Sequence, residues 1–236
     1  MENTNDLNSD VESAESHLDK GNALYAQEDY ESAISAYDKA INLNPNLAVA
    51  YNNRGNAKDV IGQHFEAISD YDTAIYLNPD NVPAYYNRGF VKSSLGHFES
   101  AISDYDAAIR LNPNYASAYN NRGIAKDKIG QHFEAISDFD TVIRLNPDDA
   151  DAYSNRGIAK VKLGHPEAAI SDFDEAIHLN PNSVNAYANR GIAKRKLGLI
   201  DDAKRDYQVA LDLAEKAGDE ELKSKIMRSM KKLETL

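Results

Sequence analysis

The phrase AYNNRG occupies residues 50–55 and returns unchanged at residues 118–123. Three close variants, AYYNRG, AYSNRG and AYANRG, begin at residues 84, 152 and 186. The glycine of the phrase recurs at intervals of 34 residues, at Gly21, Gly55, Gly89, Gly123, Gly157 and Gly191. A fixed period of this size is the signature of a protein built from stacked structural repeats. The repeat therefore decides the fold before any other feature is considered.

The composition excludes several classes of protein. The chain has 236 residues, no cysteine and a formal net charge of −12. Without cysteine there are no disulfides and no cysteine-based zinc sites. No apolar run approaches the roughly 18 residues that a membrane helix needs, and the polar, acidic N-terminus is unlike a secretory signal. We therefore expect a cytoplasmic protein that does not insert into a membrane.

The charge also limits the kind of partner. A strongly acidic chain is unsuited to binding nucleic acid through phosphate contacts. The charge is uneven, because acidic residues predominate in residues 1–183 whereas basic residues outnumber acidic ones in residues 184–236. The C-terminal end is therefore the better place for an acidic partner.

Six consecutive repeats follow when the recurring glycine is numbered position 8. They span residues 14–47, 48–81, 82–115, 116–149, 150–183 and 184–217. An acidic head of residues 1–13, expected to be disordered, precedes them, and a tail of residues 218–236 follows.

Each repeat contains two helical patterns separated by a turn. In the fourth repeat they cover residues 116–129 and 133–145, with Gly130 ending the first helix. Asn-Pro ends the second pattern in the first five repeats, because proline cannot continue a helix. The sixth repeat lacks this Asn-Pro, so its second helix can run on into the tail.

Small and aromatic residues recur at fixed positions of the repeat. Position 4 is tyrosine in five repeats, position 20 is alanine in all six, and position 24 is always tyrosine or phenylalanine. This pattern, with glycine at 8 and proline at 32, resembles the tetratricopeptide repeat (TPR) family over residues 14–217. The resemblance implies an all-α fold, an α-solenoid of six TPR helix-turn-helix units forming a right-handed superhelix with a concave groove.

The tail carries one apolar stripe on an otherwise charged helix. Leu222, Ile226, Met230 and Leu233 follow helical spacing. We expect residues 218–236 to form a capping helix that covers the end of the last repeat. The alternative is a helix that docks into a partner.

A second periodic feature combines two cations and one anion. From the second repeat onward position 7 is arginine, position 11 is lysine and position 23 is aspartate, whereas the first repeat has Lys20, Leu24 and Ala36 there. Because the lysine and aspartate disappear together, we predict a structural ion-pair ladder of exposed pairs, each contributing little. An anion-binding stripe is the alternative.

The TPR resemblance implies that a ligand lies against first-helix positions 2, 5, 6, 9, 12 and 13. Position 6 is asparagine in five repeats, at Asn53, Asn87, Asn121, Asn155 and Asn189. A carboxamide both donates and accepts hydrogen bonds, so it can pair with the backbone of an extended peptide. The alternative is that these asparagines serve only the fold.

The other groove positions predict what such a peptide carries. Repeats 2 and 4 differ at seven of 34 positions, and three of the seven are the groove positions 2, 9 and 13. Apolar residues gather at Tyr86, Phe90, Ile124 and Ile158, and basic residues at Lys128, Lys162, Arg195 and Lys196. We expect an extended segment with an apolar side chain in mid-groove and acidic residues toward the last repeat.

The function predicted from these features is a non-enzymatic scaffold or adaptor that binds a protein or peptide. A self-assembling scaffold is one alternative, and a regulatory module of an enzyme complex is another. No enzyme activity or cofactor is expected, because the sequence has no glycine-rich phosphate loop, nucleophile elbow or zinc-protease helix. No metal site is expected, because the six histidines are spread over separate turns and helices. The lysine pattern that other TPR proteins use to grip an acidic C-terminus is missing at position 5.

Overall fold

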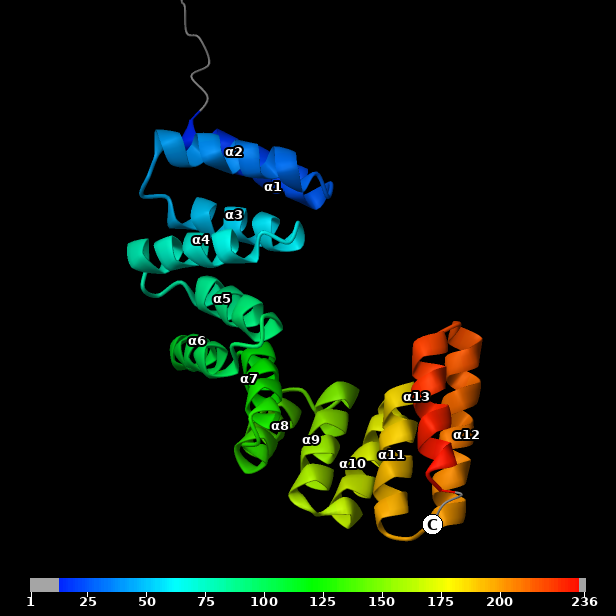
Figure 1. Cartoon of the computed structure of the whole chain (residues 1–236). Coiled ribbons are helices and arrows are strands. Elements are labelled where there is room, and N and C mark those ends of the chain that lie inside the picture. The colour runs from blue at the N-terminus through cyan, green and yellow to red at the C-terminus, as the bar shows by residue number, and fades with distance from the viewer. Residues whose placement is uncertain (1–12, 234–236) are drawn as a thin grey trace, which may run out of the picture. The chain divides into compact units, whose positions relative to one another are not determined.

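The computed structural model describes residues 13–233, so the predicted disordered head, apart from Ser13, lies outside the described residues. The described chain contains thirteen helices (Figure 1). The first six are α1 (Ala14–Ala26), α2 (Tyr30–Leu43), α3 (Ala48–Val60), α4 (His64–Leu77), α5 (Val82–Ser94) and α6 (Phe98–Leu111). The other seven are α7 (Ala116–Lys128), α8 (His132–Leu145), α9 (Ala150–Leu163), α10 (Pro166–Leu179), α11 (Val184–Lys196), α12 (Ile200–Ala217) and α13 (Glu220–Lys231).

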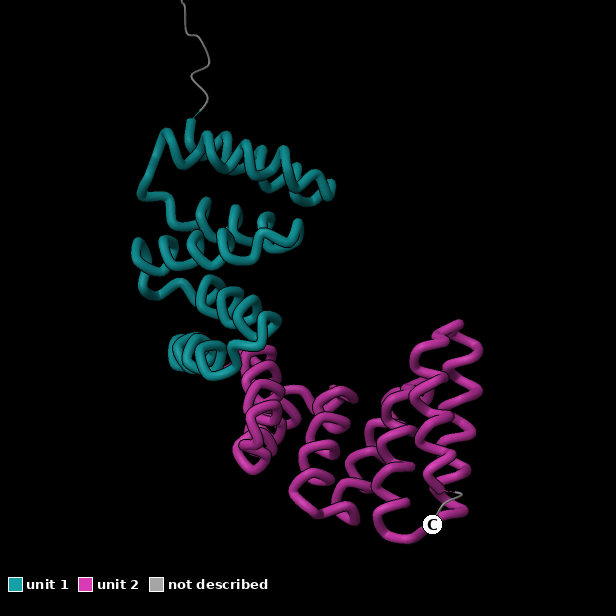
Figure 2. The backbone as a smooth tube through the Cα atoms, in the orientation of Figure 1, with its two compact units in different colours: residues 1–112 teal, residues 113–236 magenta. Residues whose placement is uncertain are grey.

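The helices form two compact units, residues 1–112 and residues 113–236 (Figure 2). In the N-terminal unit the pairs α1–α2, α3–α4 and α5–α6 each pack together, and each pair contacts the next one along the chain. In the C-terminal unit the pairs α7–α8, α9–α10 and α11–α12 do the same. The fold is therefore an all-α solenoid of sequential helix-turn-helix pairs, which confirms the fold class predicted from the repeat.

The helices end close to where the glycines and the Asn-Pro pairs predicted. Helices α7 and α8 lie within one residue of the predicted ranges, and Gly130 between them has a φ of 84°, in the left-handed region that favours glycine. Without an Asn-Pro, α12 reaches 18 residues, four more than α10. It nevertheless ends at Gly218, whose φ is 72°, so the tail forms a separate helix.

The tail helix α13 packs against α12. Ile226 and Leu233 are buried in one cluster with Tyr207 and three alanines of α12, and Leu222 and Met230 are partly buried at its edge. The apolar stripe of the tail therefore covers α12 within the C-terminal unit.

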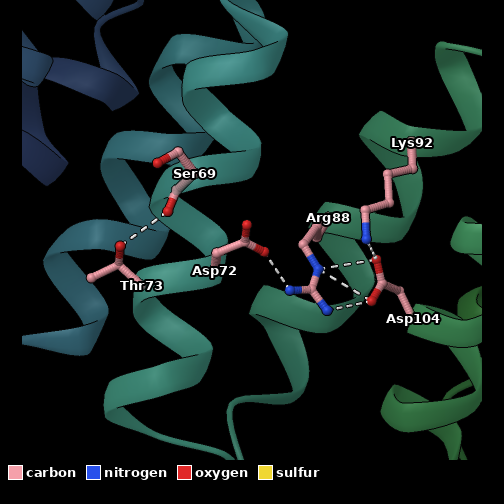
Figure 3. Close-up of polar contacts among 6 residues, drawn as sticks. All are labelled: Ser69, Asp72, Thr73, Arg88, Lys92 and Asp104. Carbon is pink, nitrogen blue, oxygen red and sulfur yellow. Dashed lines mark hydrogen bonds and ion pairs between the residues drawn. The ribbon is translucent and has the colours of Figure 1, made fainter.

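The ion-pair ladder is present, and Figure 3 shows one of its steps. Arg88 donates from Nε and Nη2 to Asp104 of its own repeat, and Lys92 donates to the same carboxylate at 2.8 Å. Arg88 Nη1 donates to Asp72 of the preceding repeat at 2.5 Å. Each position-7 arginine also lies over the position-4 tyrosine ring of its own helix, as Arg88 does at 5.6 Å from the centroid of Tyr85.

The prediction that these pairs are exposed was wrong. The side chain of Asp104 is 5% exposed, and the other position-23 aspartates are buried to the same degree. The prediction also missed the position-25 aspartates, which link an arginine to the previous repeat in Arg54–Asp38, Arg88–Asp72, Arg156–Asp140 and Arg190–Asp174. The ladder therefore joins both the two helices of a repeat and neighbouring repeats.

The pKa values of the ladder arginines agree with a structural role. Burial alone would lower the pKa of Arg54, but hydrogen bonds to Asp70 and Asp38 outweigh it and raise the pKa above its ordinary value. All three of its guanidinium nitrogens donate to carboxylates of the chain. These bonds favour a structural ladder over an anion-binding stripe.

Candidate functional site

Three first-helix residues predicted to face a ligand meet in one pocket of the N-terminal unit. Tyr86, Asn87 and Phe90 of α5 lie at positions 5, 6 and 9 of the third repeat and line a cavity of about 300 Å³. Its other lining residues are Tyr25, Asn56, Asp59, Val60 and Tyr71. We call these eight residues the aromatic pocket.

A second pocket of about 210 Å³ adjoins the first and includes another predicted residue. It is lined by Asn53 together with Asn22, Tyr37, Tyr25 and Asn56, the last two of which it shares with the aromatic pocket. The two pockets therefore form one continuous surface over the first helices of repeats 1 to 3.

The position-6 asparagines form hydrogen bonds from one repeat to the one before it. Asn87 Nδ2 donates to Asn56 Oδ1 at 2.9 Å and to Asn52 Oδ1 at 3.3 Å. Asn53 Nδ2 donates to Asn22 Oδ1 at 2.8 Å. These bonds occupy the amide nitrogens, while no described residue donates to Asn87 Oδ1, so this oxygen can accept a bond from a ligand.

The same arrangement occurs in the C-terminal unit, where Asn155 Nδ2 donates to Asn120 Oδ1 at 3.2 Å. Asn121 and Asn189 occupy the equivalent place on α7 and α11, and both are partly buried. Asparagine therefore recurs at position 6 partly because it forms a hydrogen bond to the preceding repeat.

Positions 9 and 24 are linked through the tyrosine hydroxyl. Tyr71 donates to Asn56 Oδ1 at 2.8 Å, and Tyr37 donates to Asn22 Oδ1 at 3.0 Å. In the fourth and fifth repeats position 9 is isoleucine and position 24 is phenylalanine, so the hydroxyl and its acceptor are lost together. The change from asparagine to isoleucine at position 9 between repeats 2 and 4 therefore alters the packing between helices as well as the groove surface.

We expect Tyr71→Phe to destabilise the protein by about 1 kcal/mol, because Asn56 loses a partly buried donor. Adding Asn56→Ile should recover less than this loss, because Asn87 then loses the nearer of its two acceptors. Urea unfolding of the two single variants and the double variant measures the coupling. Equal stability of Tyr71→Phe and wild type would show that the hydroxyl bond is unimportant.

The predicted apolar and basic residues of the C-terminal unit have different surroundings. Ile124 packs against the core cluster of Phe139, and Ile158 packs against that of Phe173. Lys162 forms an ion pair with Asp127 of the preceding repeat. Lys128 and Lys196 are exposed, whereas Arg195 is partly buried.

Arg195 lies close to the buried hydroxyl of Tyr207. Burial raises the pKa of Tyr207, and the positive charge of Arg195 opposes part of that rise. The predicted basic stretch is therefore not a uniform row of available cations.

Five residues of the aromatic pocket were not among the predicted site residues: Tyr25, Asn56, Asp59, Val60 and Tyr71. Tyr25 and Asp59 are at position 12, which the TPR resemblance places on the groove. The available signal was that position 12 changes in nearly every repeat, through Tyr25, Asp59, Ser93, Asp127, Val161 and Arg195.

Within residues 13–233, no helix combines the length and the apolar character needed to cross a membrane. The same residues contain no group of three or more histidine, aspartate or glutamate side chains that could hold a metal ion.

Comparison with protein families decides the classification. Residues 21–58, 61–96, 92–130 and 127–164 match the family described as TPR repeat, and residues 150–183 match the family described as Tetratricopeptide repeat. The chain belongs to the tetratricopeptide repeat family. TPR proteins generally mediate interactions between proteins, and this chain shares that scaffold.

Several solved structures resemble most of this chain. A crystal structure of MamA protein is 27% identical, covers 72% of this chain and 93% of its own, and has a TM-score of 0.68. YrrB, titled a TPR protein with an unusual peptide-binding site, is 23% identical over 82% of this chain and 98% of its own, with a TM-score of 0.68. A TPR protein from Parabacteroides merdae is 22% identical over 93% of this chain and 86% of its own, with a TM-score of 0.66. A search of curated protein sequences finds no match.

Proposed function

We propose that this TPR protein is a non-enzymatic adaptor that binds an extended peptide segment of a partner protein. The observation that carries the proposal is the aromatic pocket, where Tyr86, Asn87 and Phe90 line one cavity. Phe90 is 50% exposed, although a phenylalanine side chain is usually buried. Asn87 adds a carboxamide oxygen that can accept a bond from a peptide N–H. Apolar walls with a few polar groups are typical of ligand sites.

A peptide-display screen tests the proposal, with wild type and Phe90→Ala run side by side. Phe90→Ala is preferable to a change at Asn87, because Asn87 also bonds to the preceding repeat. We expect wild type to enrich one family of sequences and Phe90→Ala to lose it while keeping its helical circular dichroism.

The matched control is Phe65→Ala. Phe65 is 70% exposed and lies at the start of α4, outside the lining of the aromatic pocket. The control should enrich the same sequences as wild type. Enrichment that is independent of Phe90, or no enrichment at all, would contradict the proposal.

The predicted acidic part of the ligand concerns Lys128 and Lys196 of the C-terminal unit. Lys162 is less suitable, because its ammonium already pairs with Asp127. We expect Lys128→Ala with Lys196→Ala to weaken binding of an enriched peptide about fivefold at low salt and less at high salt. Fluorescence anisotropy at two salt concentrations measures this effect, and an unchanged affinity at low salt would exclude an acidic contact there.

Self-association and a regulatory role in an enzyme complex, the two alternative functions predicted from the sequence, both stay predictions. Light scattering over a range of protein concentrations distinguishes an assembling scaffold from a monomeric adaptor. A constant molar mass would argue against assembly.

A further inference from the structure

The aromatic pocket contains one charged group as well as its rings. Tyr25, Tyr71, Tyr86 and Phe90 supply aromatic rings, and Asp59 supplies a carboxylate. Aromatic ring faces carry partial negative charge and attract cations. A pocket that combines such rings with a carboxylate is better suited to a positively charged ligand group than to a purely apolar ligand group.

The carboxylate of Asp59 has one oxygen available. His64 Nδ1 lies 2.7 Å from Asp59 Oδ1, and among the described residues His64 is the only hydrogen-bond or ion-pair partner of the Asp59 carboxylate. The side chain is 21% exposed and lines the pocket, and Oδ2 has no partner among the described residues. Its charge also acts within the pocket: burial raises the pKa of Tyr71, and the negative charge of Asp59 raises it further.

In the fourth repeat the equivalent carboxylate binds a lysine of this same chain. Asp127 is the equivalent of Asp59, and His132 Nδ1 lies 2.7 Å from Asp127 Oδ1, just as His64 does from Asp59. Asp127 Oδ2, however, is paired with the ammonium of Lys162 from the next repeat. The aspartate and the histidine are thus the same in both repeats, whereas the cation is present only beside Asp127.

Asp59 of the second repeat has no equivalent of Lys162 in the repeat that follows it. The third repeat carries Ser94 at that position, and the Ser94 hydroxyl donates to Val91 O at 2.8 Å. Asp59 is correspondingly more exposed than Asp127, at 21% against 12% of the side chain. The aromatic residues differ as well, because positions 5 and 9 are Tyr86 and Phe90 here but Ser154 and Ile158 beside Asp127.

We propose that the aromatic pocket binds a lysine or arginine side chain of the partner segment, with the cation against Asp59 Oδ2 and the aliphatic stem against Tyr86 and Phe90. The partner's cation then takes the place that Lys162 occupies in the fifth repeat. This inference rests on the proposed function, since it names the side chain that the peptide presents. It also refines the expectation of an apolar residue in mid-groove, because only the stem of that residue is apolar.

Two blocked peptides test the inference, Ac-GGKGG-NH2 and Ac-GGLGG-NH2, each titrated into the full-length isotope-labelled protein. We expect the lysine peptide to shift the side-chain amide signals of Asn56 and Asn87 with saturation in the millimolar range, and the leucine peptide to bind at least about fivefold more weakly.

Three variants locate the contact. Asp59→Asn keeps the shape and removes the charge, so the lysine peptide should bind about fivefold more weakly. Ser94→Lys supplies the internal cation of the fifth repeat and should block the lysine peptide in the same way. Asp127→Asn is the matched control and should leave binding unchanged. Circular dichroism melting curves of all three variants verify folding.

The outcomes separate the inference from the proposed function. Equal binding of the two peptides, or binding of the lysine peptide that Asp59→Asn and Ser94→Lys both leave intact, would overturn the inference. If the display screen still enriched Phe90-dependent sequences without a basic residue, the proposed function would stand alone. If neither peptide shifted the pocket signals and the screen enriched nothing, both would fail.

Discussion

Asp104→Ala is expected to cost about 3 kcal/mol of the free energy of unfolding, because it leaves two cations without their shared anion. Arg88 donates to this carboxylate through Nε and Nη2, and Lys92 donates to it at 2.8 Å. The side chain of Asp104 is 5% exposed, and those of the two cations are 16% and 21% exposed. Without the anion, two like charges face each other in a poorly solvated place. Urea unfolding followed by circular dichroism measures the loss.

Asp72→Ala is the matched control, because Asp72 binds the same arginine. Figure 3 shows Arg88 Nη1 donating to Asp72. The two atoms are 2.5 Å apart, but the Asp72 side chain is 56% exposed. An exposed pair contributes about 1 kcal/mol at most, so this change should be mild. Equal losses for the two variants would show that burial does not determine the strength of the ladder.

Gly55→Asn is expected to cost about 2–3 kcal/mol through overpacking. Gly55 lies inside α3, and a Cβ atom added there would stand 2.7 Å from Cε1 of Tyr71. Tyr71 is 1% exposed, so its ring has little room to move away. The unfolding free energy in urea is again the measurement.

Gly62→Asn provides the comparison within the same repeat. Gly62 has a φ of 82° in the turn after α3, and no atom lies within 4 Å of an added Cβ. Asparagine tolerates the left-handed region better than most residues, so the loss should stay below about 1 kcal/mol. The first repeat already places Glu28 at this turn position with a φ of 62°. If Gly62→Asn lowered the free energy of unfolding as much as Gly55→Asn, the distinction between a packed and an unpacked glycine would be wrong.

These two glycines show why position 8 is glycine in all six repeats while position 15 is glycine in five. Position 8 is limited by a buried ring of the second helix, which any side chain would meet. Position 15 is limited only by backbone conformation, which other residues adopt at a modest cost. Both roles could be assigned from the sequence, because each glycine has a fixed place in the period.

The periodic sequence determined the helices, their order and the family. Local rules suffice for these features, since Gly130 and the Asn-Pro pairs end helices through backbone geometry alone. The Arg–Lys–Asp pattern could also be predicted, because the lysine and aspartate disappear together in the first repeat. Its burial could not, because exposure depends on how neighbouring helices cover the carboxylates.

Only the tertiary structure decided which residues of different repeats meet. It placed Asp72 beside Arg88, Asn56 beside Asn87, and Asp59 in one pocket with Tyr86 and Phe90. It also showed that Lys162 is paired with Asp127, whereas no lysine or arginine within residues 13–233 pairs with Asp59. The physical reason is that a period of 34 residues gives the place of a side chain within its own repeat. The contacts between repeats depend on how one helix pair packs against the next, and residues far apart along the chain share that packing.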